Sequence, residues 1–156
     1  MNTPTMTDLL YLCHHLTDSQ REEQGALMWG GYDADAFARS LAAKHGPSYV
    51  LYENDVPYCA AGFSLIAPGV ANAWLIMTEA HKRHRLAIAR HVRQGLKGML
   101  TTVHRVQTQC IISDSCACLW HRVIGMTQDC VLKGYGANGE DFGLYSITRG
   151  GNHGRR

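Results

Sequence analysis

The clearest pattern in the chain is a short apolar run, Trp74 to Thr78, followed without glycine or proline by a long amphipathic segment. One face of that segment carries Leu86, Ala89, Val92, Leu96, Met99, Leu100 and Val103, and the other carries Arg90, Arg93, Gln94 and Lys97. This spacing predicts a strand over 74–78 that leads into a helix over 86–103, whose apolar face packs on a sheet. A strand that feeds a helix is typical of α/β folds, which often place their chemistry at the intervening turn.

Helices and a hairpin are predicted before that strand. Cap signals precede residue 9 and follow residue 16, with Glu22 and Glu23 early in the second helix, where the helix dipole favours acids; the two segments are either short helices or one bent helix. Residues 33–46 have acids at the start and a glycine at the end, which predicts a third helix. Residues 49–52 and 58–66 then read as two strands around a tight turn at 53–55.

The remainder of the chain alternates strand and helix. Residues 105–113 predict a strand, and residues 116–124 a short helix that is capped by Asp114 or Ser115 and ends at Gly125. Residues 127–132 and 142–148 predict a closing antiparallel pair. With 156 residues and no repeat or linker, the chain is expected to form one domain over 1–149, followed by a flexible tail over 150–156.

Charge is unevenly distributed. The formal net charge is +2, but residues 81–105 hold seven Lys and Arg and no Asp or Glu. Such a cationic face suits a phosphate-bearing ligand, nucleic acid or an acidic protein surface, and a solvated helix face is the alternative.

The cysteines and histidines do not form a convincing metal or disulfide set. The polar start of the chain lacks a signal-peptide pattern, so the six cysteines are expected to be reduced in a cytosolic protein. Cys116 and Cys118 have the wrong spacing for a zinc knuckle, and His81 and His84 have no third ligand near them, so no metal is expected. No apolar run reaches the roughly 20 residues that span a bilayer.

The order of these elements resembles the GNAT acyltransferase fold. In that family the fourth strand delivers a loop of pattern Arg/Gln-x-x-Gly-x-Gly/Ala, whose amides and helix N-terminus hold the pyrophosphate of coenzyme A. A later family segment, Asn-x-x-Ala-x-x-x-Tyr-x-x-x-Gly-Phe, aligns in register with Asp114, Ala117, His121, Gly125 and Met126. The resemblance implies an α/β fold with a GNAT-like mixed, mostly antiparallel sheet flanked by helices.

The sequence departs from the family at both motifs. Residues 83–88 keep basic side chains but no glycine, so Cβ atoms would occupy the space where amides meet the phosphates. His121 replaces the tyrosine that serves as general acid, although a histidine can donate a proton near neutral pH. If the protein is active, the resemblance implies His121 as acid, Glu79 as base, and Arg83 and Arg85 as ligands of acetyl-CoA. If it is inactive, no residue is catalytic and no cofactor is bound.

A narrower resemblance involves the C-terminal half. Residues 80–83, 120–125 and 144–151 are similar to a small family of internal virion or morphogenesis proteins from T7-like short-tailed phages, which resemble GNAT proteins without the glycine loop. This resemblance implies a phage virion-associated or virion-assembly protein, located in the host cytoplasm during assembly, with retention in the virion left open. Its partners would be other phage structural or assembly proteins, and the closing strands could pair two copies of the chain.

Three hypotheses follow from the sequence. The favoured one is a phage assembly protein that has lost acetyl-CoA catalysis, because the glycines are absent. The alternative is a working acetyl-CoA-dependent N-acetyltransferase with an unknown acceptor. A third is a nucleic-acid binder that makes weak contact through the basic helix, although no aromatic residues are interleaved with its cations.

Overall fold

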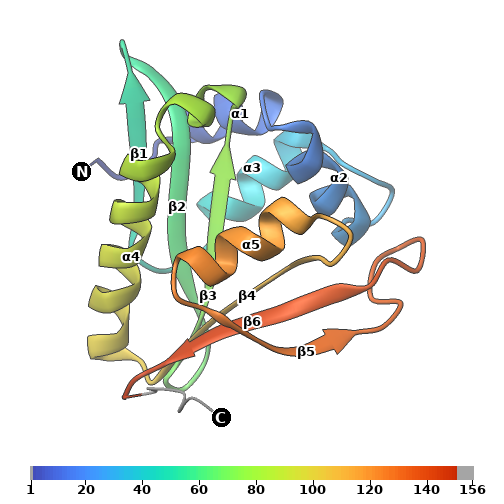
Figure 1. Ribbon diagram of the computed structural model, residues 1–156. Helices are drawn as coiled ribbons and strands as arrows, with labels where there is room; N and C mark the ends of the chain where they lie inside the picture. The colour runs from blue at the N-terminus through green and yellow to red at the C-terminus, as the bar shows by residue number, and fades with distance from the viewer. Residues whose placement is uncertain (1, 151–156) are drawn as a thin grey trace.

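A computed structural model describes residues 2–150 as a six-stranded sheet with helices on both faces (Figure 1). The strands are β1 (Ser48–Glu53), β2 (Val56–Ala67), β3 (Val70–Met77), β4 (Arg105–Ile111), β5 (Thr127–Leu132) and β6 (Phe142–Thr148). Their spatial order is β1-β2-β3-β4-β6-β5, and only β3 and β4 run parallel. The expected mixed, mostly antiparallel α/β fold is therefore confirmed.

The helices divide between the two faces of the sheet (Figure 1). They are α1 (Met6–His14), α2 (Asp18–Leu27), α3 (Ala34–Ala42), the 3₁₀ helix η1 (Glu79–Arg83), α4 (Arg85–Thr102) and α5 (Ser115–Val123). The apolar sides of α1 and α3 pack with Val50, Ala60 and Ile76 on one face. On the opposite face α4 and α5 cover a second cluster that includes Phe63, Val106 and Tyr145. Alternate residues of the central strands thus face opposite sides of the sheet and pack against the helices on both faces.

Most predicted elements are confirmed, with shifts at their ends. The predicted helix 86–103 is α4, and the predicted strand 74–78 is the second half of β3, which begins earlier because its hairpin turn lies at residues 68–69. The short helix α5 begins where Asp114 accepts a hydrogen bond from the amide of Ala117 at 3.0 Å. Of the predicted tail, residues 151–156 lie outside the described residues. Within residues 2–150, no helix combines the length and apolarity needed to cross a membrane.

One glycine in β2 allows a tryptophan to lie flat on the sheet. A Cβ at Gly62 would stand 2.6 Å from Cζ2 of Trp74, its cross-strand neighbour on β3. Any larger residue would displace the indole, which packs against the α1 and α3 core.

Candidate functional site

The two parallel strands separate soon after they begin. β3 and β4 are paired only from Val70 with Arg105 to Asn72 with Gln107, although β3 continues to Met77 and β4 to Ile111. The carboxyl halves of the strands therefore bound an opening, which we call the wedge. Ligands of open α/β sheets bind outside the carboxyl ends of strands where neighbouring connections diverge. The wedge is such a place, because β4 pairs with β6 on its other side and β3 pairs with β2 on its other side.

Helix α2 spans the wide end of the wedge. Gln20 donates from Nε2 to the carbonyl of Leu75 at 3.0 Å, and its Oε1 accepts from the amide of Met77 at 2.8 Å. One turn later, Glu23 accepts from the amide of Ile111 at the end of β4, with Oε2 at 3.3 Å. Residues three apart share one face of a helix, so a single face of α2 contacts both separated strands.

The Glu23 carboxyl group is mostly withdrawn from water. This burial raises its pKa from an ordinary value of 4.5 to about 7, against the lowering effect of the Ile111 amide, and the negative charge of Asp114 raises it further. A carboxyl group with a pKa near 7 can exchange protons under neutral conditions, as general bases do.

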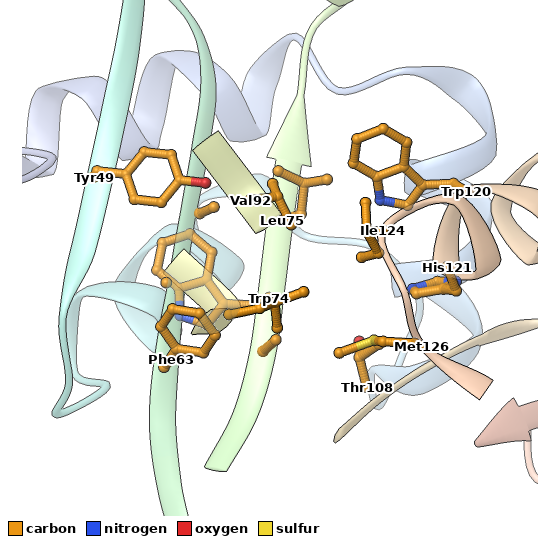
Figure 2. A pocket seen from close by; sticks show the side chains of 14 residues that line it. Tyr49, Phe63, Trp74, Leu75, Val92, Thr108, Trp120, His121, Ile124 and Met126 are labelled. Atoms are coloured by element: carbon orange, nitrogen blue, oxygen red, sulfur yellow. The ribbon is translucent and has the colours of Figure 1, made fainter. Parts of the chain in front are cut away.

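A cavity of about 40 Å³ lies on the α4 and α5 side of the sheet (Figure 2). Its walls come from β1, β2, β3, β4, α4, α5 and the turn after α5, and include Tyr49, Leu75, Val92, Thr108, Trp120, His121 and Met126. Figure 2 shows the Tyr49 hydroxyl directed from β1 toward Val92 and Leu75. Within residues 2–150 this buried hydroxyl has no hydrogen-bond partner. Unsatisfied buried polar atoms are rare and indicate a water or ligand atom.

His121 reaches the cavity from α5 (Figure 2). Its ring stacks on Tyr145 with centroids 4.8 Å apart, and Nδ1 lies 2.8 Å from the carbonyl of Ala117. A carbonyl only accepts, so Nδ1 carries the proton and Nε2 is the nitrogen available to another molecule. Burial lowers the pKa of His121, so the neutral ring is favoured. In that form Nε2 accepts a proton, and it donates one only from the imidazolium.

The turn between β3 and α4 is neither an open glycine loop nor a continuous helix. It forms η1, breaks at His84, and resumes as α4 at Arg85. The His84 side chain makes no cap hydrogen bond to α4, and the first amides of a helix lack partners within it. The start of α4 therefore presents uncapped amides and partial positive charge.

The charged residues around this turn differ in how far they are neutralised. Lys82 forms an ion pair with Glu79, and Glu53 binds both Arg83 and His84. Arg85 is exposed and makes no ion pair within the described residues. Among the cations at this turn, Arg85 is thus the most available to an anionic ligand.

The structure separates the four residues predicted from the sequence. His121 lines the cavity, and Arg83 and Arg85 flank the start of α4. Glu79 lies exposed beside Lys82, whose hydrogen bond and charge lower the pKa of the Glu79 carboxyl group. The predicted base role of Glu79 stays a prediction. The sequence reasoning missed Glu23, whose place early in α2 was attributed to the helix dipole. No local signal distinguishes it from its exposed neighbour Glu22, because its partner Ile111 is 88 positions away.

A second cavity and the absence of a metal-binding cluster among the described residues complete the description of the candidate sites. A cavity of about 190 Å³ on the α1 and α3 face is bounded by Thr3, Leu9, Leu41, Lys44, Ser48 and Trp74, among others. Within residues 2–150, no group of three or more His, Cys, Asp or Glu could hold a metal ion.

Comparison with known proteins relates this geometry to one fold. No family model and no curated protein matches the sequence. The structure resembles a putative acetyltransferase from Salmonella typhimurium with its cofactor acetyl-CoA, at 13% identity and a TM-score of 0.65, covering 99% of this chain and 96% of that one. It also resembles the ribosomal-protein-alanine N-acetyltransferase from Brucella melitensis (14% identity, TM-score 0.71, 94% and 98% covered). A GNAT-family acetyltransferase from Bacillus anthracis gives 15% identity and a TM-score of 0.67, with 95% and 93% covered.

These likenesses establish a GNAT-like fold and correct the functional expectation. At such low identity they show the fold alone. The expectation of a phage virion or assembly protein without acetyl-CoA catalysis was wrong, because the neighbours are acetyltransferases, one of them solved with acetyl-CoA, and none of the comparisons indicates a virion protein.

Proposed function

We propose that this protein is an acetyl-CoA-dependent N-acetyltransferase. The observation that carries the proposal is the wedge between β3 and β4 together with an uncapped start of α4 and a cavity lined by His121 under α4 and α5. The similarity to a structure with bound acetyl-CoA supports the same assignment.

The start of α4 fits a pyrophosphate although it has no glycine. Side chains radiate from a helix axis, whereas the first amides point along it, so they stay open to an anion even when larger residues occupy the first turn. Both Arg85 and Leu86 are exposed, and Leu86 keeps 75% of its surface accessible. Arg85 would add a full charge to the partial charge of the helix end.

The small cavity fits an acetyl group better than a longer acyl chain. Its volume of about 40 Å³ exceeds the space that a single water molecule needs, so a small group can enter it. The remainder of a coenzyme would lie outside it, over the side of the sheet that α4 and α5 cover. Acetyl-CoA, when bound, would supply the acetyl group as an activated thioester. The unpartnered Tyr49 hydroxyl is a donor that could orient a small polar group within the cavity.

His121 contributes a single nitrogen to such a site. The Ala117 carbonyl fixes the ring by its bond to Nδ1, and stacking on Tyr145 restricts its rotation. Nε2 can therefore exchange a proton with a molecule in the cavity, as an acceptor in the neutral ring and as a donor in the imidazolium. The proposed acid role requires the charged ring.

Calorimetry with acetyl-CoA tests the proposal directly. We expect binding by the unmodified protein and weakening by about 10-fold or more in Arg85→Ala, the usual effect of losing a hydrogen bond to a charged group. Lys97→Ala is the matched control, since Lys97 is an exposed cation near the other end of α4. The affinity of this variant for acetyl-CoA should equal that of the unmodified protein.

Turnover is followed by release of free thiol from acetyl-CoA with a panel of primary amines. His121→Ala should retain acetyl-CoA binding and lose turnover. Failure of the unmodified protein to bind acetyl-CoA at millimolar concentration would overturn the proposed function, and an unchanged rate in His121→Ala would reject the role of that residue.

A further inference from the structure

Glu23 is a partly buried carboxylate at the carboxyl end of β4, on the helix that also contacts the end of β3 through Gln20. Its helix lies across the wedge, and Oε2 accepts the amide of Ile111, the last residue of β4. A carboxylate has room for about four hydrogen bonds on its two oxygens. Within residues 2–150, Ile111 supplies the one hydrogen bond that Glu23 accepts from the protein.

No cation compensates this group. Among the described residues, none of the ion pairs includes Glu23, although the nearby Arg21 binds Asp18 and the carbonyl of Leu16 instead. A buried charge without a partner is unfavourable, and side chains of that kind concentrate at functional sites. The unpaired carboxylate therefore needs an explanation beyond the packing of α2.

The groups that face Glu23 favour a positively charged ligand beside it. Asp114 faces it from the turn before α5, and the Cys110 thiol interacts with it from β4. Neither is cationic, so both disfavour a further negative charge there. A ligand that carries a positive charge would be stabilised by this environment.

We propose that Glu23 binds the ammonium group of the acceptor and receives its proton, so that the acceptor enters the wedge from the side of α2. This inference rests on the proposed acetyltransferase function and assigns the acceptor to the class of cationic primary amines. The acyl donor would bind from the opposite side, because α4 and α5 cover the His121 cavity, whereas α2 packs on the other face of the sheet.

The proton balance of the reaction leaves a role for such a group. A protonated amine must lose two protons to become an amide. The first passes to the Glu23 carboxylate and then to solvent, which leaves a nitrogen lone pair for attack on the thioester carbonyl carbon. A C–N bond forms and the C–S bond breaks with its electron pair on sulfur, and the second proton ends on that sulfur as the thiol.

Glu23→Gln separates this role from a structural one. Glutamine keeps the shape and an oxygen that accepts the Ile111 amide, but it cannot take a proton. We expect kcat/KM for amines to fall by about 100- to 10,000-fold, the usual contribution of general-base catalysis, with acetyl-CoA affinity unchanged. Glu22→Gln is the matched control, because Glu22 is the adjacent, exposed residue of α2 and should keep full activity.

The pH dependence provides a second readout. In the unmodified protein kcat/KM should rise with pH through the titration of Glu23, and the amide resonance of Ile111 should shift with the same midpoint. Both changes should vanish in Glu23→Gln. An active protein whose Glu23→Gln variant keeps its rate and pH profile would overturn the inference and leave the acetyltransferase proposal intact. If the unmodified protein does not bind acetyl-CoA, the proposed function itself is wrong. If the Ile111 amide resonance does not titrate in the unmodified protein, the role of Glu23 is refuted, even if the Glu23→Gln variant fails to fold.

Discussion

Replacing Glu23 with glutamine should stabilise the fold at alkaline pH. The Glu23 carboxyl group has a pKa of about 7 in the folded protein because it is buried, and its ordinary value is 4.5. Between these values the folded state binds more protons than the unfolded state, so the free energy of unfolding falls as pH rises. Above pH 7 the folded protein must hold an unpaired carboxylate, which glutamine removes.

The size of the effect follows from the two pKa values. A shift of about 2.5 units, at 1.36 kcal/mol per unit, corresponds to roughly 3 kcal/mol at pH 8. The gain should disappear near pH 4.5, where Glu23 is already protonated in the folded state. Glutamine can still accept the Ile111 amide, so the hydrogen bond contributes little to the difference.

Urea unfolding at pH 5 and pH 8 provides the assay. We expect the difference in unfolding free energy between Glu23→Gln and the unmodified protein to grow by about 2–3 kcal/mol between these pH values, with the same denaturant slope. The control variant Glu22→Gln should show no such growth. A Glu23→Gln variant that is equally or less stable than the unmodified protein at pH 8 would refute the claim that this carboxylate is buried without compensation.

Two further predictions concern the edges of the wedge. Gln20→Ala removes two hydrogen bonds to β3 and should lower the free energy of unfolding by about 1–3 kcal/mol, as measured with urea. The control is Gln24→Ala on the same helix. Equal stability of the two variants would show that Gln20 does not stabilise the contact between α2 and β3. The Sγ atoms of Cys110 and Cys118 are 3.8 Å apart, so diamide, which removes two electrons and two protons, should join them in a disulfide of about 2.05 Å. Mass spectrometry should locate that bond, Cys118→Ser should abolish it and Cys116→Ser should leave it intact; modification of Cys116 alone would contradict the prediction.

Local sequence patterns were sufficient for most elements of the fold. Cap residues and periodicity predicted α4 and α5, since a helix is built from contacts three and four residues apart. The β1–β2 hairpin was also predictable, because Asn and Asp favour tight turns. Asn54 and Asp55 adopt the positive φ values that such a turn requires.

The site depended on contacts that no local pattern contains. The parallel pairing of β3 with β4 joins residues that are 35 positions apart, as in Val70 with Arg105. The position where this pairing stops depends on the tertiary structure, so no local pattern predicts it. Glu79 was selected as the base because it follows a strand in sequence, whereas Glu23 reaches the strand ends from another helix. The accessibility of the first amides of α4 also depends on the break at His84, which no local pattern predicts.

The short contact between β3 and β4 also divides the sheet into two halves that are each continuous in sequence. Residues 48–77 and 105–148 are separate antiparallel units, joined within the sheet by three residue pairs at the base of the wedge. Within the sheet the halves meet at these three pairs, and α2 adds a second connection because it contacts both strands. Substitutions around Ala71 and Val106 should change the spacing of the two halves without replacing any side chain that lines the His121 cavity.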